Sequence, residues 1–309
     1  MQLYFLGTGA GSPSAQRNVS ATLLDLQQER GGVWLFDCGE ASQHQMLRGP
    51  YSPRRLEKIF ISHLHGDHLF GLPGMIDTRS MQGADTPLTV YGPPGLREYI
   101  EVSLRVSYSH LIYPLEIVEI AQPGVVFNDQ TFSVECRPLS HVVPCLGYRI
   151  VEHDRPAAID ARALSAAGIA PGPLYARLKN GEVTVLDDGR QIDGKDYLLP
   201  PKPGRVVTIL GDTAFCQASV ELARNANVLV HEATFANADA LPAEKYGHSR
   251  TVDAAQVAAQ AEVKQLILNH LSARYRPESL PDLLAEAQSV FAATSMAHDL
   301  MAFEVRLSE

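Results

Sequence analysis

The sequence predicts an α/β fold in which two β-sheets pack together, helices lie outside them and the active site opens at one edge. Two observations lead to this prediction. Short apolar segments rich in β-branched residues recur along the chain, and several of them end in a single polar residue. Strands are expected to dominate the first part of the chain, whereas helices with alanine- and leucine-rich faces are expected near its C-terminus. This mixed order is typical of a layered architecture.

Five early strands are expected where apolar residues lie between turns. They are predicted at residues 3–6, 22–26, 33–37, 59–62 and 89–91. Two helices are predicted at residues 252–263 and 280–291, where apolar residues repeat along one face. The second helix is expected to begin with a capping box, because Asp282 follows Ser279 by three positions.

The composition is typical of a soluble intracellular enzyme with a sizeable buried core. The chain has 309 residues, of which 45% are hydrophobic and 20% are charged. Its four cysteines show no paired spacing, so reduced and largely buried thiols are expected. No basic leader precedes the first strand, and no apolar stretch approaches the ~18 residues of a membrane span. We therefore expect a cytoplasmic protein with no membrane partner.

A dense cluster of metal-binding side chains follows the apolar residues 59–61. Within six positions the chain presents His63, His65, Asp67 and His68. The first two can face one metal ion while the last two face a second. Imidazole and carboxylate ligands suit zinc, and also manganese or iron, better than calcium or magnesium. The alternative, a set of scattered surface histidines, is disfavoured by the tight spacing.

Further potential ligands end later apolar segments in the same way. They are His141, Asp212, the pair His231 and Glu232, and His270. Because open α/β sheets commonly place their active sites at strand ends, these residues are expected to meet at one rim of a sheet. Each residue alone would more often be a structural histidine or a turn aspartate. For His231, a core position and a direct catalytic role are equally open.

The residues between Val151 and Val206 interrupt this pattern. About fifty residues with several glycines and prolines show no sustained periodicity, whereas structureless loops beyond ~15 residues are uncommon unless they are functional or disordered. The segment is either a mobile surface insertion or an arm that grips a large substrate. The charge of the segment does not distinguish these two alternatives, because eight basic residues balance eight acidic ones over 151–205. The net charge of −9 argues weakly against a nucleic-acid partner, although local basic patches can override it.

The histidines and aspartates resemble the ligand set of the metallo-β-lactamase superfamily. This resemblance implies an αββα sandwich formed by residues 1–309 as a single domain, with a protruding arm inserted at about 152–204. It also implies two zinc ions per chain, in sites that manganese, iron or cobalt can also occupy. The implied ligands are His63, His65 and His141 for one ion and Asp67, His68 and His270 for the other, with Asp212 bridging.

Additional motifs resemble the tRNase Z branch of that superfamily, the tRNA 3′-processing ribonucleases. Two of the matches are partial, because Arg250 separates Ser249 from Thr251 and because Ser14 stands where threonine is usual. The resemblance runs from Gly7 to the C-terminus. The matching residues are His231-Glu232-Ala233-Thr234, His248-Ser249, Pro13 with Arg17 and Asn18, Ser272 with Arg274 and Tyr275, and Gly172-Pro173 with Leu178-Lys179 and Gly181.

The branch resemblance implies a zinc-dependent endoribonuclease that removes the 3′ trailer from precursor tRNA and assembles as a homodimer. Additional 3′ exonuclease activity stays open. Asp67 would be a general base as well as a ligand, and His248, oriented by Glu232, would donate a proton to the leaving oxygen. The implied substrate-binding residues are Arg17, Asn18, Gly172, Pro173, Arg177, Lys179 and Arg274.

Two rival functions and one rival motif are also open. A thioester or lactam hydrolase of the same superfamily would share the metal ligands, but it would have little use for the arm or for the pair of Glu232 and His248. A non-catalytic scaffold would be expected to lose ligands that are present here. Residues 7–11 suggest a dinucleotide-binding turn, but Ser12 replaces the third glycine and no helix is expected to follow. A tight loop near the metal rim is the preferred interpretation.

Overall fold

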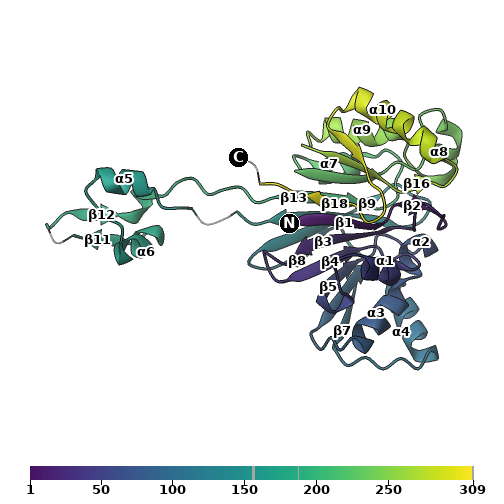
Figure 1. The fold of residues 1–309 in the computed structure, drawn as a ribbon, viewed down its shortest axis with the longest axis horizontal. Coiled ribbons are helices and arrows are strands. Elements are labelled where there is room, and N and C mark those ends of the chain that lie inside the picture. The colour runs from purple at the N-terminus through teal and green to yellow at the C-terminus, as the bar shows by residue number, and fades with distance from the viewer. Residues whose placement is uncertain (155–156, 187, 308–309) are drawn as a thin grey trace. The chain divides into compact units, whose positions relative to one another are not determined.

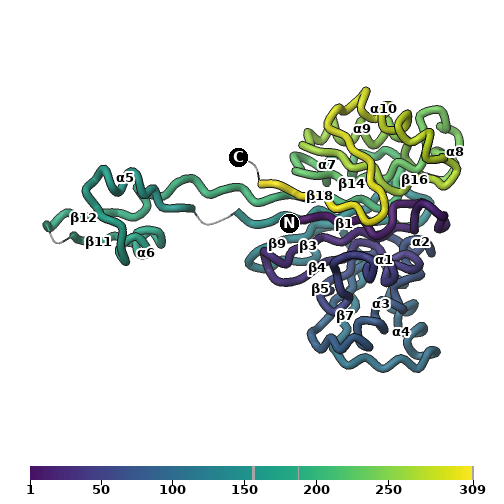
Figure 2. The backbone as a smooth tube through the Cα atoms, in the orientation of Figure 1, coloured from purple at the N-terminus to yellow at the C-terminus, as the bar shows by residue number. Residues whose placement is uncertain are grey.

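The computed structural model describes residues 1–154, 157–186 and 188–307, drawn as a ribbon in Figure 1 and as a tube in Figure 2. The chain divides into two compact units. The first unit combines Met1–Val151 with Arg205–Arg306, and the second consists mainly of Glu152–Gly204. Each unit has an apolar core of its own.

The first unit contains two seven-stranded sheets. The first sheet consists of β1 Gln2–Gly7, β3 Ala21–Leu26, β4 Gly32–Phe36, β5 Leu56–Phe60, β6 Leu88–Gly92, β7 Leu115–Glu119 and β18 Ala302–Glu304. Its strand order is β18-β1-β3-β4-β5-β6-β7. The strands from β4 to β7 run parallel to one another, whereas β18, β1, β3 and β4 pair in antiparallel fashion.

The second sheet also mixes parallel and antiparallel pairs. It consists of β8 Gly124–Asn128, β9 Phe132–Leu139, β10 Cys145–Glu152, β13 Val206–Leu210, β14 Val228–Glu232, β15 Leu266–Asn269 and β17 Thr294–Met296. Its order is β17-β15-β14-β13-β10-β9-β8, with β13, β14, β15 and β17 parallel. A small parallel pair, β2 Gly9–Ala10 with β16 Leu271–Ser272, lies outside both sheets.

Alternating apolar residues hold the layers together. In β4, Trp34 and Phe36 lie in the core between the two sheets, whereas Val33 and Leu35 lie in the core beneath the helices. Ile267 of β15 enters the same inter-sheet core from the second sheet. Successive side chains of a strand point to opposite faces, so a strand that is apolar at every position is buried on both faces.

Helices cover the outer face of each sheet (Figure 1). Those on the first sheet are α1 Ser42–Arg48, α3 Leu72–Met81 and α4 Leu96–Val106, and those on the second are α7 Gln217–Ala223, α9 Thr251–Gln260 and α10 Leu280–Val290. The first unit is therefore an αββα sandwich, as expected.

The predicted strands and helices are confirmed, with shifts of a few residues at their ends. The capping box expected at Ser279 is wrong. Ser279 does precede α10, but its side chain accepts no hydrogen bond from the first turn of the helix, and its hydroxyl donates to the Arg276 carbonyl at 2.8 Å. A carboxylate instead caps α9, where Asp253 accepts the Arg250 N–H at 2.9 Å.

The second unit is small but folded. It contains α5 Ala161–Ala166, α6 Pro173–Lys179 and an antiparallel pair, β11 Val183–Val185 with β12 Gln191–Asp193. Four buried side chains form its core: Leu164, Ile169, Leu178 and Ile192. Elements this short leave no sustained periodicity in a sequence.

All four cysteines are free thiols, and Cys38, Cys136 and Cys145 are buried, as expected. In the described parts of the chain, no helix has the length and apolar character that crossing a membrane requires.

A buried ion cluster joins the two sheets of the first unit. Glu29 Oε1 lies 2.7 Å from the Arg205 guanidinium and 2.7 Å from the N-terminal ammonium of Met1. The side chains of Glu29 and Arg205 are only 8% and 6% exposed. Burial raises the pKa of Glu29, but hydrogen bonds from the N-terminus and from Arg205 outweigh it, so the pKa is lowered from 4.5.

Glu29→Gln is expected to lower the free energy of unfolding by roughly 3 kcal/mol at pH 7, because it replaces the buried carboxylate of an ion pair by a neutral amide. A lowered folded-state pKa stabilises the protein above about pH 4.5, and this contribution is lost as the pH falls through the folded value. The difference in the free energy of unfolding between wild type and variant, measured by urea titration, should therefore shrink as the pH falls below about 5. A difference that is absent at pH 7, or constant with pH, would contradict this account.

Candidate metal centre

Side chains from both sheets meet where their strands end. The seven predicted ligands are His63 and His65 after β5, Asp67 and His68 in the short helix α2 Gly66–Leu69, His141 after β9, Asp212 after β13 and His270 after β15. They form two groups, and within each group the potential ligand atoms lie within 4.8 Å of one another. The structure thus brings together all seven residues that the sequence singled out.

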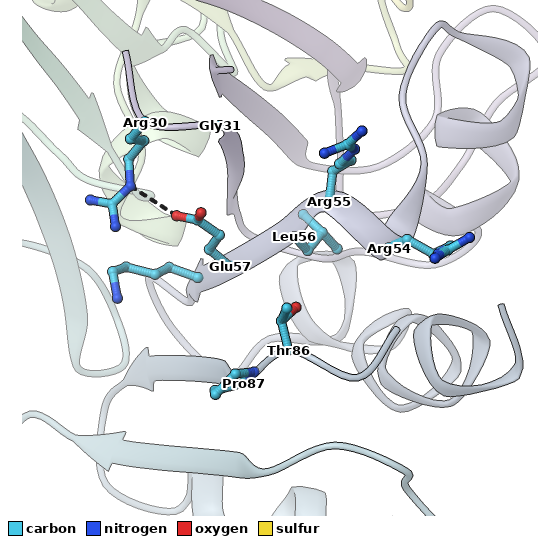
Figure 3. A pocket seen from close by; sticks show the side chains of 9 residues that line it. Arg30, Gly31, Arg54, Arg55, Leu56, Glu57, Thr86 and Pro87 are labelled. Atoms are coloured by element: carbon cyan, nitrogen blue, oxygen red, sulfur yellow. Dashed lines mark ion pairs between the residues drawn. The ribbon is translucent and has the colours of Figure 1, made fainter. Parts of the chain in front are cut away.

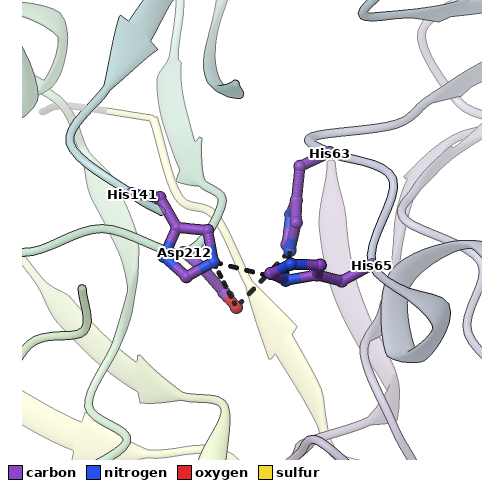
Figure 4. Close-up of side chains that lie close together, drawn as sticks. All are labelled: His63, His65, His141 and Asp212. Carbon is purple, nitrogen blue, oxygen red and sulfur yellow. Dashed lines mark hydrogen bonds and ion pairs between the residues drawn. The ribbon is translucent and has the colours of Figure 1, made fainter. Parts of the chain in front are cut away.

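The first group consists of three histidines and Asp212, which point toward a common centre (Figure 4). His63 Nε2 lies 3.0 Å from His65 Nδ1 and 3.7 Å from Asp212 Oδ2. His141 Nε2 lies 3.3 Å from the same His65 nitrogen. Burial, and then the neighbouring His68, lower the pKa of His63 to about 2, so its imidazole is neutral and can bind a cation.

The second group consists of Asp67, His68 and His270. The Nε2 atoms of the two histidines are 3.1 Å apart, and Asp67 Oδ2 lies 3.3 Å from His270 Nε2. Asp212 Oδ1 lies 3.4 Å from each of these Nε2 atoms. Because Asp212 Oδ2 faces the first group, this one carboxylate presents an oxygen to each group.

Hydrogen bonds behind the histidines determine which ring nitrogen carries the proton. His68 Nδ1 lies 2.7 Å from the Asp37 carboxylate, and His141 Nδ1 lies 2.8 Å from the Gly247 carbonyl. Both partners can only accept, so each Nδ1 carries a proton. In the neutral ring the lone pair is then on Nε2, which faces the centre.

Hydroxyl groups orient the other two Nε2 ligands. The Thr234 hydroxyl donates to Glu232 at 2.6 Å, so it accepts from His270 Nδ1 at 2.8 Å. The Ser62 hydroxyl donates to Asp37 at 2.9 Å, so it accepts from His63 Nδ1 at 3.0 Å. In their neutral form, four histidines therefore present an unprotonated Nε2 to the centre.

Sequence reasoning assigned no role to Asp37, Ser62, Thr234 or Gly247. Asp37 is predicted to end the strand 33–37, but it lies just beyond β4 with a φ of 56°. Its carboxylate also accepts the Ser62 N–H at 2.7 Å. His270 has the same φ of 56°. A left-handed backbone at non-glycine residues is uncommon and is often found at functional sites. The available signal for Asp37 was its position: it ends an apolar segment, as Asp212 does.

The chemistry of the donors fits divalent transition-metal ions. Asp212 is 2% exposed, and in the described parts of the chain its ion-pair partners are all histidines, with no lysine or arginine. Burial raises the pKa of Asp212, but the surrounding histidines lower it well below its usual value. A buried carboxylate of this kind needs a cation, and neutral imidazoles supply the remaining ligands that zinc prefers.

His248 and Glu232 form a pair beside the centre, and His248 also lies close enough to Asp212 and His270 to form a third potential ligand group with them. His248 Nδ1 lies 2.8 Å from Glu232 Oε1 and 3.8 Å from Asp212 Oδ2. Glu232 also accepts the N–H groups of Thr213 at 2.9 Å and Thr234 at 3.2 Å, so its carboxylate is rigidly held. Burial lowers the pKa of His248, but Glu232 outweighs it and raises the pKa to about 9.

The structure answers two questions that the sequence left open, namely where His231 lies and what the Gly-rich turn forms. His231 is fully buried in β14, its Nδ1 bonds the Glu232 carbonyl at 2.7 Å, and it belongs to neither ligand group, so it is a core histidine. The Gly-rich turn at residues 7–11 is a tight loop at the metal rim, because the Gly11 N–H donates to Asp67 Oδ2 at 2.7 Å.

The predicted substrate-binding residues of the first unit have structural partners. Arg17 donates to Thr8 at 2.6 Å and to the Ala297 carbonyl at 2.7 Å. Asn18 Nδ2 donates to the Glu40 carbonyl at 2.8 Å. The exposed Arg274 lies over the Phe235 ring and near Asp239. Contacts with a substrate stay a prediction for these residues.

The four predicted arm residues lie at one helix of the second unit. Gly172 precedes α6, Pro173 is its first residue, and Arg177 and Lys179 lie in its last turn. Arg177 pairs with Glu182 at 2.9 Å, whereas Lys179 is exposed.

A pocket of about 320 Å³ lies at the start of β5, away from the strand end that carries His63 (Figure 3). Arg54 and Arg55 line it, together with Arg30, which pairs with Glu57 at 2.9 Å. It contains none of the predicted ligands.

Asp37→Asn is expected to weaken zinc binding about 10- to 100-fold, because a neutral amide replaces the carboxylate that orients His68. Competition with a fluorescent chelator measures the affinity, and circular dichroism checks the fold. The exposed aspartate variant Asp282→Asn is the matched control. Wild-type affinity in a folded Asp37→Asn protein would refute the orienting role.

Comparisons with known proteins identify the family. Curated relatives named ribonuclease Z, from Bacillus cereus and Bacillus mycoides, are each 56% identical to this chain over 305 residues, which is 99% of both sequences. A family model described as anti-Pycsar protein Apyc1 matches residues 1–135.

Solved structures agree with this result. Human tRNase Z, short form, superposes with a TM-score of 0.72 and 30% identity over 99% of this chain and 100% of that one. The metallo-β-lactamase fold protein YhfI from Bacillus subtilis, at 19% identity and a TM-score of 0.67, covers 98% of each chain and shows the shared fold. With a metallo-β-lactamase fold and more than half of its residues identical to ribonuclease Z relatives along the whole length, the chain belongs to the ribonuclease Z family.

Proposed function

We propose that this protein is a zinc-dependent endoribonuclease that removes the 3′ trailer from precursor tRNA. One observation carries the proposal: two adjoining ligand groups share Asp212 and have the His248–Glu232 pair beside them, in a member of the ribonuclease Z family. The resemblance further supports a cytoplasmic homodimer, and additional 3′ exonuclease activity would fit the same site.

Two zinc ions are the proposed cofactors. One ion would be held by His63, His65 and His141, and the other by Asp67, His68 and His270. Asp212 would contact both ions. Manganese, iron or cobalt would suit the same ligands. When bound, paired divalent ions supply positive charge that stabilises the attacking and leaving oxygens of an in-line phosphoryl displacement.

Asp67 is proposed to accept the proton of the attacking water. The Gly11 N–H and His270 engage its Oδ2. Oδ1 has no hydrogen bond within the described ranges, so it is the oxygen that can take a proton. The carboxylate would thus be both a ligand and a general base.

His248 is proposed to donate a proton to the leaving ribose oxygen. Its Nδ1 is occupied by Glu232, so the proton would leave from Nε2. Glu232 favours the protonated imidazole and is held in turn by Thr213 and Thr234. Glu232 is therefore a positioning residue, whereas His248 contacts the substrate.

The second unit is proposed as the arm that binds the body of the tRNA, within a single-domain enzyme. Exposed Lys179 and Arg177 offer positive charge to phosphates, and Gly172 and Pro173 shape the start of their helix. Arg274, Arg17 and Asn18 are proposed to contact the RNA nearer the cleavage site.

A thioester or lactam hydrolase of the same superfamily is the alternative. It would use the same ligands but would have no need for a proton donor suited to a ribose oxygen, nor for the second unit. Incubation with end-labelled precursor tRNA, a thioester and a β-lactam, each with and without chelator, separates the two. We expect chelator-sensitive release of the 3′ trailer and no turnover of the small substrates. Thioester or lactam turnover with intact precursor would overturn the proposal.

His248→Ala is expected to lower kcat for precursor tRNA about 10²- to 10⁴-fold, because general acid catalysis contributes about that much. Metal content measured by elemental analysis should stay at the wild-type value. His44→Ala, which removes an exposed histidine, is the matched control. Near-normal turnover by a metal-loaded His248→Ala enzyme would remove His248 from the mechanism.

Arg177→Ala combined with Lys179→Ala is expected to raise KM for precursor tRNA. It should also reduce the slope of log affinity against log salt by about 1 to 2, because binding with fewer phosphate contacts releases fewer counterions. Hydrolysis of a nitrophenyl phosphodiester should not change, since remote binding and local chemistry are separable. The pair Arg162→Ala and Lys202→Ala removes equal exposed charge from the same unit. Equal effects of the two double substitutions would contradict the prediction, because tRNA binding would then depend only on the total charge of the second unit.

A further inference from the structure

A pocket of about 410 Å³ adjoins the candidate metal centre. Its walls include His65 and Asp67, the loop at residues 11–13, Glu40 and Phe70. This volume lies within the roughly 300–1,000 Å³ of small-molecule sites. Neither the ligand groups nor the His248–Glu232 pair accounts for Glu40 and Phe70.

Phe70 is an exposed aromatic residue in the wall of this pocket. It is 64% exposed, whereas Phe36 and Phe60 are buried in the inter-sheet core. Its ring packs against Gly66: a Cβ at residue 66 would be 2.2 Å from a ring carbon. The ring therefore offers an apolar surface to the pocket, which suits stacking of a planar group.

Glu40 offers a hydrogen-bond acceptor in the same pocket. Its main chain is tied down by Asn18, which donates to the Glu40 carbonyl at 2.8 Å. Its exposed carboxylate makes no hydrogen bond or ion pair within the described ranges, so it can accept from a ligand. Carboxylates commonly accept from the exocyclic amino group of a base, as they do from cytosine N4.

We propose that this pocket binds one nucleobase next to the cleaved phosphodiester, stacked on Phe70 with its amino group facing Glu40. The inference rests on the proposed function, and it adds a base preference to it. Since Asp67 lines the pocket and belongs to the candidate metal centre, a base held there lies beside the reacting phosphate. Amino-bearing bases are favoured over uracil, whose O4 would face the carboxylate as a second acceptor.

The test uses precursor tRNAs that differ only in the base on either side of the cleaved bond. Wild-type enzyme should prefer adenine or cytosine to uracil at one of these positions by about tenfold in kcat/KM, as expected for one hydrogen bond to a charged group. Glu40→Gln, whose amide both donates and accepts, should abolish this preference. No cleavage of any precursor would contradict the proposed function, whereas cleavage without base preference would contradict this inference alone.

Phe70 is tested by binding as well as turnover. Phe70→Ala should raise KM about 5- to 150-fold, the range expected for one lost base–aromatic stack, and Phe70→Tyr should restore it. A precursor with 2-aminopurine beside the cleaved bond reports stacking through fluorescence quenching on chelator-treated enzyme, without turnover. Tyr108→Ala, which removes an 84% exposed aromatic elsewhere, is the matched control. Unchanged quenching in Phe70→Ala, with Phe70→Tyr also unchanged, would overturn the role of Phe70 in the pocket.

Discussion

The buried Asp212 carboxylate is the group on which the whole centre depends. It carries a negative charge at 2% exposure and faces histidines from both sheets, so the fold must bring the ends of β5, β13 and β15 to one point. The αββα sandwich does this because its strands end at a common edge, while apolar side chains on both faces of each sheet stabilise the layers.

Orientation of the ligands depends on a second set of hydrogen bonds, many of them between distant parts of the chain. Asp37, Ser62, Thr234 and the Gly247 carbonyl each engage a histidine Nδ1 and direct the opposite nitrogen inward. Thr234 also links His270 to Glu232, so the metal ligands and the proposed proton donor form one network. A change at any of these partners would move a ligand without removing it.

Much of this could be predicted from the sequence, because the ligands are polar residues that end apolar strands. His63 to His68 are close in sequence, and Asp212 and His270 follow the same rule. Asp37 follows it too, but its role depends on His68, 31 residues away, and on a left-handed backbone. The hydrogen bond from Arg17 to the Ala297 carbonyl joins residues 280 positions apart, and no local pattern in the sequence reveals it.

Anomalous diffraction at the zinc absorption edge, on crystals of the full chain grown with zinc, tests the central claim most directly. The account predicts two peaks about 3.5–4 Å apart, with Asp212 oxygens at about 2.0–2.2 Å from both. One peak should be coordinated by His63, His65 and His141, and the other by Asp67, His68 and His270. A single peak, or a pair of peaks in which Asp212 contacts only one ion, would contradict the bridging role from which the proposed mechanism follows.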